Sequence, residues 1–169
     1  MSDSSARPVQ DPSRQFAVLK SALEHMDQGI SVVDADLNVV EFNRKFLDLL
    51  ELPATHFKPG FHMSEAFRHN AERGEYGDGD VDELVQERVT LAKRFEAHRF
   101  ERTRPNGRTL EIHGQPLDEG GFVTTYTDIS ERKRTEEALR ESQQRQALIL
   151  EAVAEGIYEW NIEENSLYV

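Results

Sequence analysis

The sequence predicts an α+β domain in which a five-stranded antiparallel sheet carries short helices on one face. We expect an amphipathic helix before this domain and a coiled-coil linker helix after it. Three observations support this prediction. Two short apolar strands lie within residues 29–42, and three alternating strands lie within residues 97–128. Short helical stretches separate the two groups, and the chain becomes charged and helical from residue 129.

The composition excludes several classes of protein. With 169 residues, of which 37% are hydrophobic and 31% charged, the chain can form one core, a solvated surface and helical extensions. No apolar run approaches the ~20 residues that span a bilayer, and the N-terminus lacks the apolar core of a signal peptide, so we expect a cytoplasmic protein with no membrane partner. Zero cysteines exclude disulfides, thiolate metal sites and flavin–cysteinyl photochemistry. The net charge of −12 argues against nucleic acid as a partner.

The N-terminal part predicts one helix. Residues 1–11 are rich in Ser, Asp and Pro and are expected to form a disordered leader. Asp11 can cap a helix whose first residue is Pro12, and residues 12–28 are predicted to form this amphipathic helix. Its apolar side chains recur at three- and four-residue spacing at Phe16, Leu19, Leu23 and Met26. This helix is the natural cover for the second, partly apolar face of the sheet, either in its own chain or in a partner's.

The first half of the domain combines two strands with short helices. The strands are expected at residues 29–34 and 38–42, and Asn43 can cap the short helix that follows. Helical turns are predicted over residues 64–73, and Asp80 opens a second clear helix. We expect these helices to cover one face of the sheet.

The last three strands complete a domain that is expected to span residues 29–129. Residues 97–104 are predicted to pair with residues 108–117 across the turn at 105–107, whose Pro-Asn-Gly sequence is a strong hairpin signal. Residues 108–117 are then expected to pair with residues 121–128. The outcome is a meander of three antiparallel strands.

The C-terminal part is predicted to be a coiled-coil helix over residues 130–154. Its candidate seam follows alternating four- and three-residue steps at Thr135, Leu139, Ser142, Gln146, Ile149 and Val153. The polar members make this seam weak. A weak seam suits a helix that changes register, but a simple spacer shows the same pattern. The seam and the N-terminal apolar stripe together predict a parallel homodimer.

The last residues repeat the start of the domain in pattern. Residues 23–34 and residues 150–161 both contain an apolar helix end, Gly-Ile, a short strand and then Asp or Asn. The repeat predicts that residues 155–169 are the truncated start of a second domain of the same kind. We therefore expect the chain to be a fragment of a longer protein.

Three segments together resemble one family. They are the Ala-Glu-Arg-Gly-Glu-Tyr-Gly segment at residues 71–77, the strand and hairpin sequence at residues 99–112, and the strand exit at residues 128–130. Residues 23–132 resemble a bacterial PAS sensory domain of the subgroup that carries the first of these segments. The resemblance implies a sensory and dimerisation module ahead of an effector, such as the histidine kinase of a two-component system or a diguanylate cyclase. It also implies that residues 155–169 begin a second PAS domain.

The exit of the last strand is the predicted signal relay. It runs without a loop into the helix, and the candidate relay residues are Thr127, Asp128, Ser130 and Arg132. The resemblance implies that Asp128 and Ser130 fasten the last strand to the outgoing helix. From the residues themselves, Asp128 can cap that helix, and Asp128 and Arg132 have the i,i+4 spacing of a charge pair. The alternative is a ligand-free PAS domain that serves only for homodimerisation and assembly.

The sequence leaves the ligand site open. The six histidines lack the spacing of a metal site and no catalytic set is identifiable, so we expect neither a metal nor enzyme activity in this chain. The resemblance places His69 where haem-binding PAS domains have an axial ligand. The aromatic residues that could line a pocket for a small molecule are Phe42, Phe67, Phe100 and Tyr126. Such aromatic residues are also typical of a plain core, so the cofactor stays open between none, haem and a flavin.

Overall fold

The computed structural model describes residues 11–118 and 120–163. The chain divides into two compact units, Met1–Ile129 and Ser130–Val169. The first unit contains a sheet with its helices, and the described part of the second unit is a helix. None of the helices in this described part is long and apolar enough to pass through a lipid bilayer.

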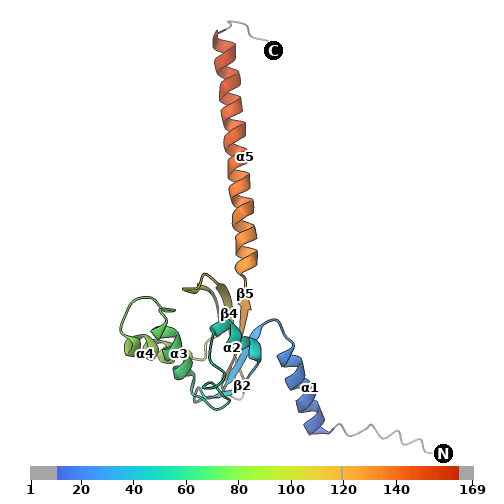
Figure 1. Ribbon diagram of the computed structural model, residues 1–169, viewed down its shortest axis with the longest axis vertical. Coiled ribbons are helices and arrows are strands. Elements are labelled where there is room, and N and C mark those ends of the chain that lie inside the picture. The colour runs from blue at the N-terminus through green and yellow to red at the C-terminus, as the bar shows by residue number, and fades with distance from the viewer. Residues whose placement is uncertain (1–10, 119, 164–169) are drawn as a thin grey trace, which may run out of the picture. The chain divides into compact units, whose positions relative to one another are not determined.

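The first unit is built on one antiparallel sheet of five strands, as the sequence predicts (Figure 1). The strands run in the order β2-β1-β5-β4-β3, and each neighbouring pair is antiparallel. The last strand in the sequence, β5, therefore lies at the centre of the sheet. The strands are β1 (Gly29–Val33), β2 (Val39–Phe42), β3 (His98–Thr103), β4 (Thr109–Pro116) and β5 (Phe122–Asp128).

Three short helices pack on one face of this sheet, namely α2 (Arg44–Leu50), α3 (Met63–Glu72) and α4 (Val81–Ala92). Asn43 caps α2 as predicted, because its Oδ1 accepts from the Phe46 amide at 3.1 Å. The same oxygen accepts from the Ile30 amide on β1 at 2.9 Å, so the cap also fixes the helix to the sheet. Asp80 caps α4, again as predicted.

The core lies between these helices and the sheet. In β4, Leu110 and Ile112 are buried while Glu111 between them is half-exposed, which is the alternation that the sequence predicts. Phe46 on α2 is completely buried, and its ring lies 5.3 Å from the Tyr126 ring on β5. The sheet, α2 and α3 therefore share one continuous apolar core.

The N-terminal helix α1 (Pro12–Glu24) begins where the sequence predicts. Asp11 accepts a hydrogen bond from the Ser13 amide at 3.0 Å and caps the helix. The helix ends before the predicted residue 28. A ring nitrogen of His25 lies 2.7 Å from the Ser21 carbonyl oxygen, so the His25 side chain closes the last turn.

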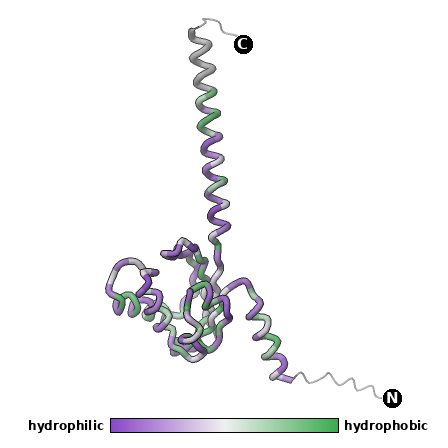
Figure 2. The backbone as a smooth tube through the Cα atoms, viewed as in Figure 1, coloured by the Kyte–Doolittle hydropathy of each residue, from purple (hydrophilic) through white to green (hydrophobic). Residues whose placement is uncertain are grey.

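The apolar stripe of α1 is exposed. Figure 2 shows hydrophobic residues along α1. Phe16 is 62% and Leu19 is 64% exposed, and no side chain of the helix is buried. Polar contacts tie its end to the domain, including a bond from the Arg44 amide to Glu24 Oε2 at 3.0 Å. In the described residues, α1 thus does not cover the second face of its own sheet. An amphipathic pattern predicts that a helix face will be covered, but it does not say by which surface.

The helix of the second unit is α5 (Ser130–Glu163). It contains the predicted coiled-coil segment 130–154, in which the apolar seam residues are 54–59% exposed. The helix continues through Gly156, where the sequence predicts a break and a short strand. A single strand has no neighbour to pair with, whereas a helix makes its hydrogen bonds within the segment. The start of a second domain stays a prediction, and residues 164–169 lie outside the described residues.

Candidate functional site

A mostly apolar cavity of about 420 Å³ lies between the sheet and helices α3 and α4. The sheet contributes Ile112, Phe122 and Tyr126 to its wall, and α3 contributes Phe67 and Asn70. The volume lies within the range of about 300–1,000 Å³ that is typical of small-molecule sites. An apolar cavity with a few polar groups is the arrangement that such sites share.

A glycine shapes the wall of the cavity at β4. A Cβ atom on Gly114 would lie 2.2 Å from Phe122 Cε1 and 2.6 Å from the His98 ring. Because Gly114 has no side chain, the rings of His98 and Phe122 stack there, with 5.2 Å between their centroids. Both rings line the cavity.

Three of the four aromatic residues proposed as pocket lining contact this cavity, namely Phe67, Phe100 and Tyr126. Phe42 does not. Its ring lies 5.7 Å from the Phe46 ring and 6.1 Å from the Phe61 ring, so Phe42 packs against the core. Phe42 belongs to β2, the edge strand farthest along the sheet from β3, and β3 and its hairpin supply much of the cavity wall.

Two buried polar atoms of the cavity wall have no hydrogen-bond partner among the described residues. Asn70 is only 3% exposed, and its Nδ2 donates to the Tyr76 hydroxyl at 3.4 Å while its Oδ1 is unpartnered. The Nε of Arg88 is likewise buried and unpartnered. A buried polar group left unsatisfied costs ~1–3 kcal/mol. A ligand that bonds to these atoms would remove that cost.

Two guanidinium groups stack on the ring of Tyr76. The Cζ of Arg88 lies 4.7 Å and the Cζ of Arg102 lies 4.9 Å from its centroid, and Arg102 also lies 5.5 Å from the Phe100 centroid. These cation–π contacts hold both positive charges at the cavity wall. Burial raises the pKa of Tyr126, whose hydroxyl therefore stays protonated at neutral pH.

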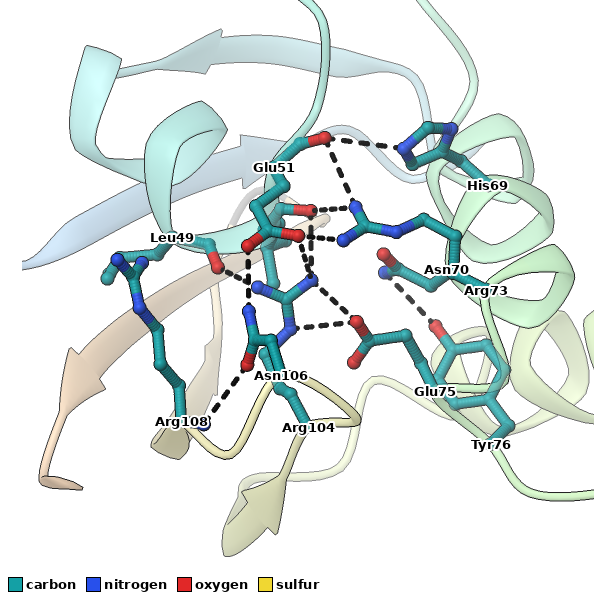
Figure 3. Close-up of polar contacts among 11 residues, drawn as sticks. Leu49, Glu51, His69, Asn70, Arg73, Glu75, Tyr76, Arg104, Asn106 and Arg108 are labelled. Carbon is teal, nitrogen blue, oxygen red and sulfur yellow. Dashed lines mark hydrogen bonds and ion pairs between the residues drawn. The ribbon is translucent and has the colours of Figure 1, made fainter.

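Next to Tyr76 in the chain lies a buried ion pair that the sequence did not reveal (Figure 3). Arg104 is 2% exposed and donates to Glu75 Oε1 from Nε at 2.8 Å and from Nη2 at 2.5 Å. Its guanidinium also donates to the carbonyl oxygens of Leu49 and Leu50 at the end of α2. One side chain thereby joins the β3–β4 hairpin, the α3–α4 connection and α2.

Glu51 extends this network (Figure 3). It ends α2 in the left-handed conformation, with φ of 53°, and its carboxylate pairs with Arg73. The same carboxylate lies 3.6 Å from Arg104 Nη2 and accepts from Asn106 Nδ2 at 2.7 Å. The turn of the β3–β4 hairpin is therefore held against the end of α2.

The fold family follows from a comparison with protein-family models. The model described as the PAS fold matches residues 23–137, which include every strand of the sheet and helices α2 to α4. The chain belongs to the PAS family. The resemblance seen in the sequence is thereby confirmed for the domain. No curated protein matches the chain in sequence.

Solved PAS domains share this fold at low sequence identity. The PAS domain of BvgS from Bordetella pertussis is 19% identical with a TM-score of 0.50, over 76% of this chain and 98% of that one. A PAS domain of an HTR-like protein from Haloarcula marismortui is 22% identical with a TM-score of 0.45, over 69% and 93%. A domain of a sensory box sensor histidine kinase/response regulator from Geobacter sulfurreducens is 18% identical with a TM-score of 0.45, over 70% and 98%. At 19% identity the likeness to the BvgS domain shows the fold alone.

His69 of this PAS domain does not face the cavity. It lies on α3, but its Nε2 is 3.3 Å from the Glu51 carbonyl oxygen, and its ring packs edge-on against Phe57. It is absent from the described residues that line the cavity. A haem in the cavity would need an axial nitrogen that points into it, and His69 does not supply one. Among the described residues no cluster of three His, Asp or Glu side chains could hold a metal ion.

The exit strand of the PAS domain stays paired to its end. Asp128 is in register with Leu110 on β4. The Ile129 amide then donates to the Thr109 carbonyl oxygen at 2.9 Å. The backbone is therefore fixed to the sheet up to the last residue of the first unit.

The other relay candidates lie on both sides of this point. The Thr127 hydroxyl accepts from Gln28 Nε2 at 2.8 Å, which links β5 to the segment before β1. Ser130 is the first residue of α5, and Arg132 forms an i,i+4 ion pair within that helix at 3.9 Å. The pairing of Arg132 with Asp128 stays a prediction.

Proposed function

We propose that this PAS domain binds a small molecule in its cavity and relays the resulting change into α5, which controls a downstream effector. The effector would be a histidine kinase or a diguanylate cyclase. One observation carries this proposal. β5 lines the cavity through Tyr126 and stays paired up to Ile129, the residue before α5 begins.

The position of β5 suits a relay. Tyr126 is paired with Gly29 on β1 and with Ile112 on β4, so a shift of its side chain moves a strand that is held on both sides. Since no loop separates the strand from the helix, a shift of the strand end reaches the first turn of α5. The residues that we assign to this relay are Thr127, Asp128, Ser130 and Arg132.

We further propose a cytoplasmic, parallel homodimer without catalytic activity of its own. The exposed apolar side chains support association, because Phe16 and Leu19 on α1 are 62% and 64% exposed and Leu139 on α5 is 59% exposed. Large exposed apolar residues at helical spacing are typical of surfaces that pack against another chain.

A ligand-free assembly element is the second candidate, and the exposed stripe of α1 favours it as much as it favours a sensor. Native mass spectrometry and an absorption spectrum of the freshly purified protein separate the two functions. A copurifying small molecule or chromophore supports sensing. A colourless protein that has the mass of the polypeptide alone and binds no small molecule supports assembly.

The relay is tested by Asp128→Ala in the full-length protein. We expect effector output to change by about fivefold or more, the lower end of typical allosteric couplings, while ligand affinity changes less. Asp78→Ala, in an exposed turn between α3 and α4, is the matched control. Unchanged output in Asp128→Ala, measured beside this control, removes the junction from the mechanism.

A further inference from the structure

We propose that the cavity takes a small carboxylate with an apolar body, and that the guanidinium group of Arg88 binds the carboxylate. This inference rests on the proposed function, because it names the class of ligand for the same cavity. Three features of the wall carry it: an excess of positive charge, two unpartnered polar atoms and an apolar remainder.

Positive side chains outnumber negative ones in the wall. Arg88, Arg94 and Arg102 line the cavity, with Glu96 as the single carboxylate among the described lining residues. Within the described chain, Arg88 and Arg102 have no ion pair and stack on Tyr76 instead. A cation–π contact leaves the charge itself in place. The excess is local, since the whole chain carries a net charge of −12.

The unpartnered atoms define what the ligand must offer. Arg88 Nε is a buried donor, and an anionic acceptor satisfies it best because charge-assisted hydrogen bonds are roughly twice as strong as neutral ones. The planar guanidinium fork matches the two oxygens of a carboxylate. Asn70 Oδ1 is a buried acceptor, so the ligand also needs a hydroxyl or N–H group.

The rest of the wall restricts the body of the ligand. Side chains such as Phe67, Ile112 and Phe122 offer no hydrogen bonds. A sugar or a free phosphate would bury further polar groups against them without partners, which is costly. An aromatic or branched aliphatic body buries apolar surface there instead. The chemistry of the wall therefore favours an apolar acid over a polyol or inorganic phosphate.

Arg88 is the anchor because the deeply buried guanidinium of Arg104 is already satisfied. Arg104 is bonded to Glu75 and to the carbonyl oxygens of Leu49 and Leu50. It is also not among the described lining residues. Arg88 stacks on the Tyr76 ring, but its Nε has no hydrogen-bond partner among the described residues.

The test uses the 169-residue chain and a panel of aromatic and aliphatic carboxylic acids, each paired with its own methyl ester, with inorganic phosphate beside them. Calorimetry should show at least one acid that binds about tenfold or more tightly than its ester, because the ester loses the charge-assisted bond. Arg88→Gln should abolish this preference, and Arg88→Lys should restore part of it. Lys93→Gln, an exposed cation at the end of the same helix, should leave it unchanged. Circular dichroism checks that each variant folds, and Arg88→Met, which keeps the length of the side chain without its charge, replaces Arg88→Gln should the latter unfold.

The outcomes separate this inference from the proposed function. Three results would each overturn the carboxylate as the class of ligand but leave the proposal of a ligand-binding cavity intact. They are esters that bind as tightly as the acids, inorganic phosphate that binds as tightly as the acids, and an acid preference that survives Arg88→Gln. Where none of the panel binds, native mass spectrometry of the purified protein decides. A copurifying acid supports the inference. A copurifying neutral molecule overturns the inference but leaves the proposed function standing. The absence of any bound molecule overturns both the inference and sensing.

Discussion

At the scale of residues, the Arg104–Glu75 pair positions one side of the cavity. Tyr76 follows Glu75 in the chain, and Arg102 precedes Arg104 by two residues. The buried pair therefore holds together the segment of Tyr76 and the segment of Arg102, whose side chains stack on each other. Both segments are those in which the sequence resembles the PAS subgroup. Desolvation offsets much of the attraction within a buried pair, so its main effect is to specify this arrangement.

Removing one partner should nevertheless destabilise the domain strongly. Glu75→Gln removes the bonded counter-charge of the buried Arg104 guanidinium and leaves only the Glu51 carboxylate 3.6 Å away, so we expect the free energy of unfolding to fall by about 3 kcal/mol. Urea denaturation followed by circular dichroism measures this. Glu87→Gln on the exposed face of α4 is the control and should change stability by less than about 0.5 kcal/mol. Equal effects of the two substitutions would show that the pair is not a stabilising contact.

The sequence could not predict this pair, because Glu75 and Arg104 are 29 residues apart and lie outside any common helix or strand period. Periodicity reports neighbours on one element only. Glu75 stands in a glycine-rich, charged segment, where a solvent-exposed carboxylate is the ordinary expectation. The cap Asn43 was predicted, because a cap is set by residues within one turn.

At the scale of elements, local patterns predicted the strands and helices but not the surfaces between them. The β3–β4 hairpin forms where the turn sequence places it, and Gly107 adopts the positive φ of 82° that this turn needs. The cavity was anticipated only through its aromatic residues. Its polar atoms on Asn70 and Arg88 belong to two different helices, α3 and α4, whose packing fixes their position.

The exposed stripe of α1 should be a dimer contact. We expect Phe16→Glu combined with Leu19→Glu to shift a dimer toward monomer by about tenfold or more in dissociation constant, because charges replace two exposed apolar side chains that the dimer would bury. Ala17→Glu adds a charge on the opposite side of the helix and should leave association unchanged. Sedimentation equilibrium measures the three proteins. A wild-type chain that stays monomeric at high micromolar concentration contradicts the dimer itself.

At the scale of the whole molecule, the exposed seam of α5 supports the proposed pairing with another copy. It is 34 residues long, and the apolar members of its seam are exposed along the described helix. Helical stability in proteins comes chiefly from packing of an apolar face, so such a helix gains most by pairing with another copy. In a parallel pair of chains, the two β5 strands would lead into two helices that run in the same direction and in register. The proposed relay requires this arrangement.

The absence of cysteine from the chain allows a direct test of this pairing. In a parallel, in-register coiled coil the two copies of Ser142 face each other across the seam, so Ser142→Cys should form a disulfide-linked dimer under mild oxidation. Gln144→Cys lies on the outward side of the same helix and should cross-link far less, because its two copies point away from each other. Non-reducing electrophoresis at low micromolar protein reports the yields. Equal yields for the two variants, or no disulfide for Ser142→Cys in a sample that sediments as a dimer, would place the α5 helices in another arrangement, and a relay through a parallel pair would then have no structural basis.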